Sequence, residues 1–349
     1  MDTTIRAALA VALYAAFPKF SDLFLLWLRQ QRLAPVGLTG PGNFEYPPLA
    51  ALYWWPFSNL PTPTAAVIAN AIVMGGLAVA VTWVLIRIAG DGDKGHLRMW
   101  AASPTLIFFL PINWEAAVIL LMMLGVSALV REKEAQAGGW LAAGTAMKVF
   151  PGAIALPVLP LLRDNARRLR FLAVGAATGI AIYAFDMFWL RPDNWRFQFD
   201  AARIREDYEA TVWAGLEWLL DLFGIDLSLS AINALALATT IVALIALTWW
   251  CYRNRPTIFE VSALAVMAFI VCNKTFKPQY LLWVLPLLAL SRVARRPVLA
   301  AEIAVIVDFA TYHFEAVEFL QPAAVIVRTI ALLVIAWELL ARYRRQPRF

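Results

Sequence analysis

The sequence has few residues of the kinds that build metal centres and disulfide frameworks. Only two cysteines and two histidines occur among 349 residues. Cys251 and Cys272 lie far apart in the chain and show no ligand spacing, so neither a disulfide framework nor a metal site is expected. The phosphate-binding pattern G-x-x-x-x-G-K-[ST] is also missing, which argues against a protein powered by a cytosolic nucleotide. Energy is therefore expected from a gradient or from an already activated lipid substrate.

Charged residues are scarce as well. They make up 15% of the chain, whereas a soluble domain carries about a quarter. Hydrophobic residues make up 62%, the mean hydropathy is +0.68, and 15 Trp and 21 Phe residues can anchor at headgroup level. This composition predicts an all-α, polytopic transmembrane helical bundle. No repeat or separate soluble domain is visible, so residues 1–349 are expected to form one integral membrane domain.

The apolar runs predict about twelve membrane spans, several of them too short to cross a bilayer alone. We place them near 5–20, 64–89, 98–110, 114–130, 138–148, 149–162, 170–190, 230–252, 258–272, 279–290, 298–312 and 323–341. The first run lacks a small-residue cleavage site, so we interpret it as a retained span rather than a signal peptide.

The net charge of +6 indicates membrane topology rather than a nucleic-acid partner, because the basic residues lie in short loops between apolar runs. The positive-inside rule places most of them, and both termini, in the cytoplasm. This cytoplasmic set is Arg6, Arg87, Lys94, Arg98, Arg131, Lys133, Arg163, Arg167, Arg168, Arg170, Arg253, Arg255, Arg292, Arg295, Arg296, Arg342, Arg344, Arg345 and Arg348.

Two sizeable loops are then expected on the outer side. The first runs from Ser21 to about Pro63, and its segment Leu49–Leu60 is too short and too proline-bounded to span, which favours an interfacial helix. The second, Arg191–Leu229, mixes aromatic and charged residues in a way typical of a segment lying at the membrane surface.

The clearest functional signal is the turn Cys272-Asn-Lys-Thr-Phe-Lys-Pro-Gln-Tyr280 between two apolar runs. Ionisable groups at the edge of the hydrocarbon are costly and mark functional sites by default. Lys274 and Lys277 could simply solvate the turn. Two cations within four residues, beside Gln279 and Tyr280, fit anion binding better, and phosphate is the natural anion near lipid.

Asp22 follows the first predicted span directly and has two interpretations. A carboxylate at a membrane boundary can act as a general base. The alternative is a solvated helix cap for the segment Leu23–Gln31, because Ser and Asp are common caps.

Other polar residues on the outer side also carry two interpretations. Lys148, between two apolar runs, could bind an anion or snorkel to the interface. Glu115 could cap the helix that follows it or contact a sugar hydroxyl. Arg203 and Asp207 have the i, i+4 spacing of a helical ion pair. Three further residues end a predicted span on this side and could line a cavity: Asp308, Tyr312 and His313.

Taken in chain order, these motifs resemble the GT-C superfamily of integral membrane glycosyltransferases. The nearest branch is family 87, the bacterial polyprenol-phosphate-mannose-dependent mannosyltransferases. The Gln279-Tyr-x-x-Trp283 turn also resembles that of the eukaryotic GPI mannosyltransferase. The motifs that carry the resemblance are Asp22, Glu45-Tyr-Pro-Pro-Leu49, Asn113-Trp-Glu115, Met147-Lys-Val-Phe-Pro151, the loop Phe199…Arg203…Asp207…Trp213, and Lys277-Pro-Gln-Tyr-Leu-Leu-Trp283.

The resemblance implies a GT-C-like fold, a polyprenyl-phosphate sugar donor, most simply carrying mannose, and a glycolipid or glycan acceptor. It places the active site on the extracytoplasmic side of the plasma membrane, with Asp22 as catalytic base. Candidate donor-phosphate ligands are Lys274, Lys277, Lys148 and Arg203. Candidate substrate-binding residues are Glu45, Tyr46, Glu115, Asp207, Trp213, Gln279 and Tyr280. Asp22 has no acidic neighbour, so a divalent metal is not indicated and no cofactor beyond the lipid-linked donor is expected.

The chemistry of glycosyl transfer agrees with this assignment. Cations stabilise a phosphate leaving group, and one base without a nucleophilic partner suits a single, inverting displacement. The alternatives are a polytopic transporter or lipid flippase, or a membrane scaffold. A transporter is expected to show inverted repeats, which are not visible here, and a scaffold has no need of lysines near the bilayer.

Overall fold

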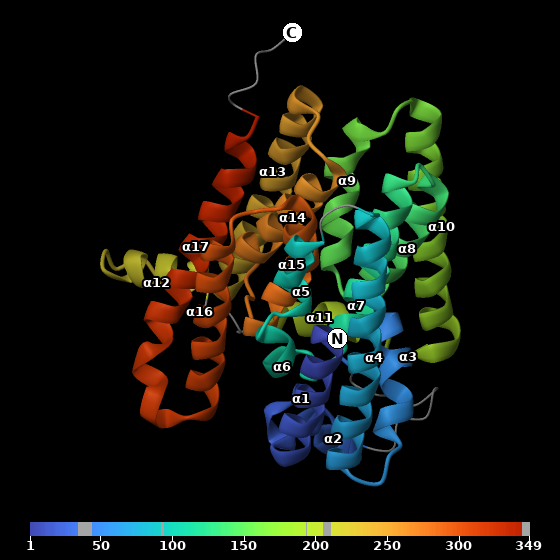
Figure 1. Cartoon of the computed structure of the whole chain (residues 1–349). Helices are drawn as coiled ribbons and strands as arrows, with labels where there is room; N and C mark the ends of the chain where they lie inside the picture. The colour runs from blue at the N-terminus through green and yellow to red at the C-terminus, as the bar shows by residue number, and fades with distance from the viewer. Residues whose placement is uncertain (34–43, 92–93, 193, 205–210, 344–349) are drawn as a thin grey trace. The chain divides into compact units, whose positions relative to one another are not determined.

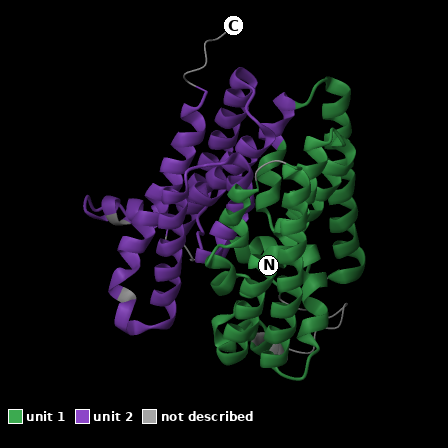
Figure 2. Ribbon diagram, viewed as in Figure 1, with its two compact units in different colours: residues 1–155, 162–202 green, residues 156–161, 203–349 purple. Residues whose placement is uncertain are grey.

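The structure is a computed structural model that describes the chain except for residues 34–43, 92–93, 193, 205–210 and 344–349. All regular structure in the described residues is helical (Figure 1). Contacts divide the chain into two compact units (Figure 2). Unit 1 comprises Met1–Ala155 and Leu162–Ala202, and unit 2 comprises Leu156–Leu161 and Arg203–Phe349. The all-α class is confirmed, and a single domain over 1–349 stays a prediction.

Unit 1 contains the N-terminal helices, in which α8 packs on α7 and α10, and α4 packs on α1 and α7. The α8–α10 contact depends on Gly138, because a Cβ there would lie 2.2 Å from the Phe171 carbonyl oxygen. Small residues permit such close backbone approach between membrane helices. The α-helices of this unit are α1 (Asp2–Ala16), α2 (Asp22–Leu33), α3 (Pro48–Ser58), α4 (Pro63–Ala89), α5 (Arg98–Ala101), α6 (Thr105–Phe109), α7 (Glu115–Val130), α8 (Glu134–Met147) and α10 (Asn165–Phe185).

Unit 2 contains α13 (Leu229–Asn254) and four helices that follow it: α14 (Ile258–Cys272), α15 (Leu281–Ser291), α16 (Arg295–His313) and α17 (Gln321–Ala341). The helix α14 packs on α13, α15 and α17, and α16 packs on α17. Every residue of α15 is buried, so this helix forms the centre of the unit. A capping box fixes the start of α14: Thr257 and Glu260 satisfy each other's backbone N–H groups.

Short helical segments lie between the longer helices. The helix α9 (Ala155–Val158) and the 3-10 turn η4 (Leu159–Leu161) lie near the first boundary between the units. The helices α11 (Phe197–Ile204) and α12 (Val212–Asp221) lie in the segment predicted to rest at the membrane surface. The predicted interfacial segment Leu49–Leu60 is also helical, as α3, which begins at a proline.

Four described helices are long and apolar enough to cross a membrane: Pro63–Ala89, Asn165–Leu190, Leu229–Asn254 and Gln321–Ala341. Four shorter apolar helical segments accompany them: Glu115–Val130, Phe150–Leu161, Ile258–Cys272 and Pro278–Ser291. The protein is therefore a multi-pass membrane protein, but the count of about twelve spans is not confirmed.

One predicted span is broken. The run 98–110 forms α5 and α6 rather than one helix, because the chain leaves helical geometry at Ser103, directly before Pro104. The chain after α6 leads directly into the Asn113-Trp-Glu115 motif.

The sequence directly after α4 contains the pattern G-x-G-x-x-G, at Gly90–Gly95. This pattern predicts a dinucleotide site only where it follows a β-strand and opens a helix within a βαβ unit. Here it follows the 27-residue helix α4, so it carries no such prediction.

Candidate active site

The lysine turn lies in unit 2, between α14 and α15. Asn273, at the C-cap of α14, is extended, and the chain re-enters helical geometry only at Pro278, which begins the 3-10 turn η6 (Pro278–Tyr280). Lys274 is only 8% exposed, and Lys277 is half-buried, with its Nζ 5.5 Å from the centre of the Tyr312 ring. The sequence thus predicted correctly that two cations lie in a turn between buried apolar helices.

A buried ion pair lies against this turn and bonds to its backbone. Arg328 of α17 and Asp308 of α16 both have fully buried side chains and form a salt bridge. Arg328 Nη2 also donates to the carbonyl oxygen of Phe276 at 3.0 Å, and its guanidinium carbon lies 4.1 Å from the centre of the Phe276 ring. Asp308 was expected to line a cavity, but the structure pairs it with Arg328. An arginine in the middle of the apolar run 323–341, whose other charged residue, Glu338, lies near its end, was the signal for this pair.

Aromatic residues pack around the same turn. Tyr280 stacks on Trp283 with ring centres 3.7 Å apart, and Gln279 is buried beside it. The indole nitrogen of Trp213, from α12, donates to the Cys272 carbonyl oxygen at 3.0 Å. The structure therefore brings Trp213 to the lysine turn, although 59 residues separate it from Cys272.

Arg203 lies exposed in α11, and its backbone carbonyl accepts a hydrogen bond from Asn233 Nδ2 at 2.8 Å. Its expected partner Asp207 lies outside the described residues. The predicted ion pair between Arg203 and Asp207 therefore stays a prediction.

The candidate base Asp22 is the first residue of α2 in unit 1 and is exposed. The buried hydroxyl of Ser21 accepts a hydrogen bond from the Leu23 N–H, so Ser21 caps this helix and Asp22 occupies its first position. The same hydroxyl lies 3.0 and 2.8 Å from the carbonyl oxygens of Pro111 and Ile112. The start of α2 is thereby tied to the loop that leads into Asn113-Trp-Glu115, and the role of Asp22 as a base stays a prediction.

Glu115 and Lys148 form one buried ion pair. Lys148 Nζ lies 2.5 Å from Glu115 Oε1, with the two side chains 11% and 0% exposed. Glu115 begins α7, and Lys148 directly follows α8. Lys148 therefore does not snorkel to the interface. Desolvation offsets much of the attraction in a buried pair, so stability alone is a weak reason for placing one here.

A second arginine clamp holds the Glu45-Tyr46 motif. Arg191 binds both carboxylate oxygens of Asp186 at 2.7 Å and donates through Nη1 to the carbonyl oxygens of Phe44 and Tyr46, at 2.9 and 3.1 Å. Sequence reasoning missed this clamp, because Arg191 lies 145 residues from Tyr46.

The Tyr46 ring meets Trp114 edge-on, with ring centres 4.7 Å apart. Behind this contact, Tyr53 donates to Asn70 Oδ1 at 2.6 Å, and Asn70 donates to the carbonyl oxygens of Pro111 and Asn113. Burial raises the pKa of Tyr53 well above its usual value, so this hydroxyl stays a hydrogen-bond donor. The Glu45-Tyr46 and Asn113-Trp-Glu115 motifs therefore lie together in unit 1.

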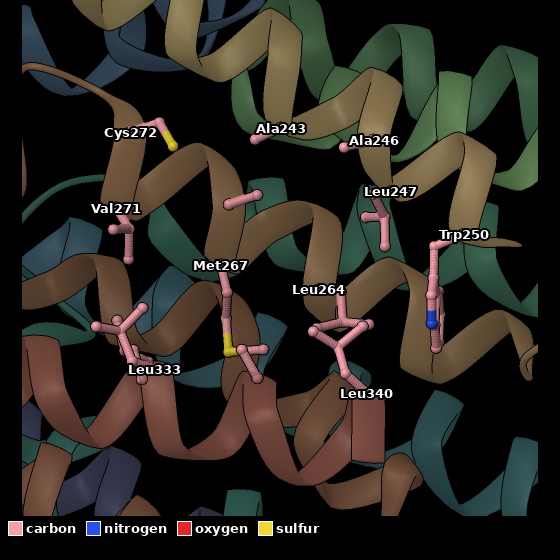
Figure 3. Close-up of a pocket in the computed structure, with 13 residues that line it drawn as sticks. Ala243, Ala246, Leu247, Trp250, Leu264, Met267, Val271, Cys272, Leu333 and Leu340 are labelled. Atoms are coloured by element: carbon pink, nitrogen blue, oxygen red, sulfur yellow. The ribbon is translucent and has the colours of Figure 1, made fainter. Parts of the chain in front are cut away.

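An apolar slot lies beside the lysine turn within unit 2, with a volume of about 420 Å³ (Figure 3). Cys272, one residue before Asn273, marks one end, and Trp250 and Leu340 mark the other. From Cys272 to Leu264 the slot follows α14 for about 12 Å at 1.5 Å per residue. Its lining residues are Ala243, Ala246, Leu247, Trp250, Leu264, Met267, Ala268, Val271, Cys272, Leu332, Leu333, Ala336 and Leu340.

The described residues contain no group of three or more His, Cys, Asp or Glu side chains arranged to hold a metal ion. That the reaction needs no metal ion stays a prediction. The site residues thus divide between the two units: Asp22, Glu45, Tyr46, Glu115 and Lys148 lie in unit 1, and Lys274, Lys277, Gln279, Tyr280, Trp213 and Arg203 lie in unit 2.

Apolar helices, polar turns at their ends and buried ion pairs define a polytopic helical membrane protein with a candidate anion site. A family model described as glycosyltransferase family 87 matches residues 44–273, and the chain belongs to this family. The predicted resemblance to family 87 is therefore confirmed. The matched range includes Glu45, Glu115 and Lys148, but it begins after Asp22 and ends just before Lys274.

Over 179 residues the chain is 30% identical to a polyprenol-phosphate-mannose-dependent alpha-(1-2)-phosphatidylinositol mannoside mannosyltransferase of Mycobacterium tuberculosis (strain ATCC 25618 / H37Rv). The alignment covers 47% of this chain and 40% of that protein.

Proposed function

We propose that this protein transfers mannose from a polyprenyl-phosphate donor to a glycolipid or glycan acceptor at the outer face of the cytoplasmic membrane. Membership of family 87 supports the reaction class, and the relative's dependence on polyprenol-phosphate-mannose supports the donor. The observation that carries the proposal is the lysine turn beside an apolar slot within one unit. Transfer of labelled mannose from such a donor by the purified protein tests it.

The donor has an anionic head and an apolar tail, and unit 2 offers a matching pair of surfaces. Lys274 and Lys277 supply cations for the phosphate. The slot begins at Cys272 and runs along α14 away from the lysines, as a chain attached to that phosphate requires. Its volume falls in the range of about 300–1,000 Å³ of small-molecule sites, so it holds part of the chain and leaves the rest in the bilayer.

The proposed reaction is a single displacement. Asp22 accepts the proton of the acceptor hydroxyl, the hydroxyl oxygen bonds to the anomeric carbon, and the bond from that carbon to the phosphate oxygen breaks. The polyprenyl phosphate leaves with the bonding electrons, and Lys274 and Lys277 stabilise the charge that develops on it. Attack from the face opposite the leaving group inverts the anomeric centre.

The remaining candidate residues bind substrate in this proposal. Lys148 and Arg203 add positive charge for the donor, and Glu115 orients Lys148 through their ion pair. Tyr46 and Glu45 present the aromatic and polar groups that sugars contact, as do Trp213, Gln279 and Tyr280. Asp207 retains its predicted substrate-binding role.

Blocking the slot is expected to affect long-chain donors selectively. Tryptophan in place of Leu247, near the Trp250 end, fills the far part of the slot, and each displaced methylene forfeits about 0.8 kcal/mol, so losing two lowers kcat/KM by about tenfold. A donor with one isoprene unit ends near Cys272, does not reach the blocked region and keeps its rate. Ile245→Trp, on the exposed face two residues away, is the matched control. An equal loss with both donors would refute the role of the slot.

The proposed orientation has the Arg163–Arg170 segment, which includes the start of α10, in the cytoplasm and the Arg191–Leu229 segment outside. Single cysteines at the exposed positions 166 and 200 are then expected to react with an impermeant maleimide from opposite sides of the membrane. Labelling of both from the same side would show that the orientation is wrong.

A further inference from the structure

Arg328 is unfavourable in free energy where it lies, because its charge is removed from water. It is fully buried within the 21-residue apolar helix α17, and its carboxylate partner Asp308 is fully buried as well. Taking two charges out of water costs several kcal/mol per ion, and apolar residues of similar volume often replace such pairs without loss of stability. Stability alone is therefore a poor explanation for the pair.

The contacts that Arg328 makes with Phe276 indicate another role. Arg328 donates to the carbonyl oxygen of Phe276 and covers the Phe276 ring, and Phe276 lies between Lys274 and Lys277. Residues 273–277 have no helical hydrogen-bond ladder of their own. The bond from Arg328 thus anchors the middle of the turn to the core of the unit.

The helix α16 contributes one residue to the buried ion pair and another to the surroundings of the lysine turn. Asp308 and Tyr312 are four residues apart, so they share one face of the helix. Asp308 holds Arg328, and the Tyr312 ring faces Lys277 Nζ at 5.5 Å. The planar guanidinium can bond a carboxylate and a carbonyl while stacking on a ring, which an ammonium group cannot do.

We propose that Arg328 is a positioning residue for the lipid-phosphate site. It fixes the backbone between the two lysines, so that both ammonium groups are held for the phosphate of the donor before the donor binds. This inference rests on the proposed role of Lys274 and Lys277. Arg328, like the two lysines, lies beyond residue 273, where the family match ends.

The test uses Arg328→Lys, which keeps the charge opposite Asp308 but cannot also hold Phe276. A misplaced site typically costs up to about 10²-fold, so kcat/KM for the donor is expected to fall about 10- to 10²-fold, with KM for the acceptor unchanged. The matched control is Arg342→Lys. Arg342 follows α17 and likewise bridges a carboxylate and a carbonyl, those of Glu260 and Ser291. This control is expected to retain the donor kcat/KM.

A double-mutant cycle separates positioning from general destabilisation. If Arg328 acts through Lys277, Arg328→Lys costs much less in a Lys277→Ala background than in the wild type. Losses that simply multiply, or equal losses for Arg328→Lys and Arg342→Lys, would overturn the inference. Should Arg328→Lys not fold, Phe276→Leu removes the ring beneath the guanidinium and is expected to lower donor kcat/KM in the same Lys277-dependent way.

The same cycle distinguishes the two levels of the argument. An undiminished donor kcat/KM in Lys277→Ala would refute the part of Lys277 in the proposed donor site, and the inference with it. A strong effect of Lys277→Ala beside a wild-type rate for Arg328→Lys would refute the positioning role alone.

Discussion

Asp22→Asn is expected to slow sugar transfer by about 10²–10⁴-fold, the usual contribution of general-base catalysis. Asparagine has the size and shape of aspartate but cannot accept the proton of the acceptor hydroxyl. The helix α2 should remain intact, because the Ser21 hydroxyl caps it in both proteins. Donor binding should also remain, so the loss is expected in kcat.

Asp2→Asn is the matched control, since Asp2 is likewise the exposed first residue of a helix in the same unit. It is expected to leave the rate unchanged. Rates of folded Asp22→Asn and Asp2→Asn proteins, measured side by side at saturating donor, decide the matter. Near-normal turnover of Asp22→Asn would mean that another residue is the base.

Lys274→Ala and Lys277→Ala are each expected to remove about 2–4 kcal/mol of transition-state stabilisation, or about 30- to 10³-fold in kcat/KM. The reason is the charge that develops on the leaving phosphate. Lys274 is nearly fully buried, so water substitutes poorly for its ammonium group.

The control for this pair is Lys133→Ala, an exposed lysine in the loop before α8. It removes the same charge from the protein and is expected to leave kcat/KM unchanged. The measurement is the steady-state rate at varied donor concentration for folded protein. Normal donor affinity and turnover in both turn variants would remove the lysines from the site.

Apolar runs predicted the class of the fold because burial of apolar side chains decides it, and the long helices α4, α10, α13 and α17 agree with predicted spans. The number of spans was less predictable. A short apolar run reads the same whether it crosses a membrane or packs inside the protein, as the broken run 98–110 illustrates.

Single site residues were also more predictable than their partners. The lysine turn was visible because charge is rare beside apolar runs. The pairs Glu115–Lys148 and Asp308–Arg328 join residues that are 33 and 20 positions apart, so they depend on how elements meet in space, and sequence spacing does not encode that. The cap at Ser21 is of the same kind, because hydrogen bonding from its hydroxyl to the carbonyl oxygens of Pro111 and Ile112 helps to place it.

The most direct test of the proposed function supplies the purified protein, in lipid vesicles, with polyprenyl-phosphate-mannose labelled in the sugar. A glycolipid acceptor is present, and GDP-mannose is offered in a parallel reaction. The account predicts that label moves from the polyprenyl phosphate to the acceptor and that free polyprenyl phosphate appears in equal amount, with no transfer from GDP-mannose. Label that stays on the donor while the donor itself crosses the bilayer would contradict the account and indicate a lipid flippase.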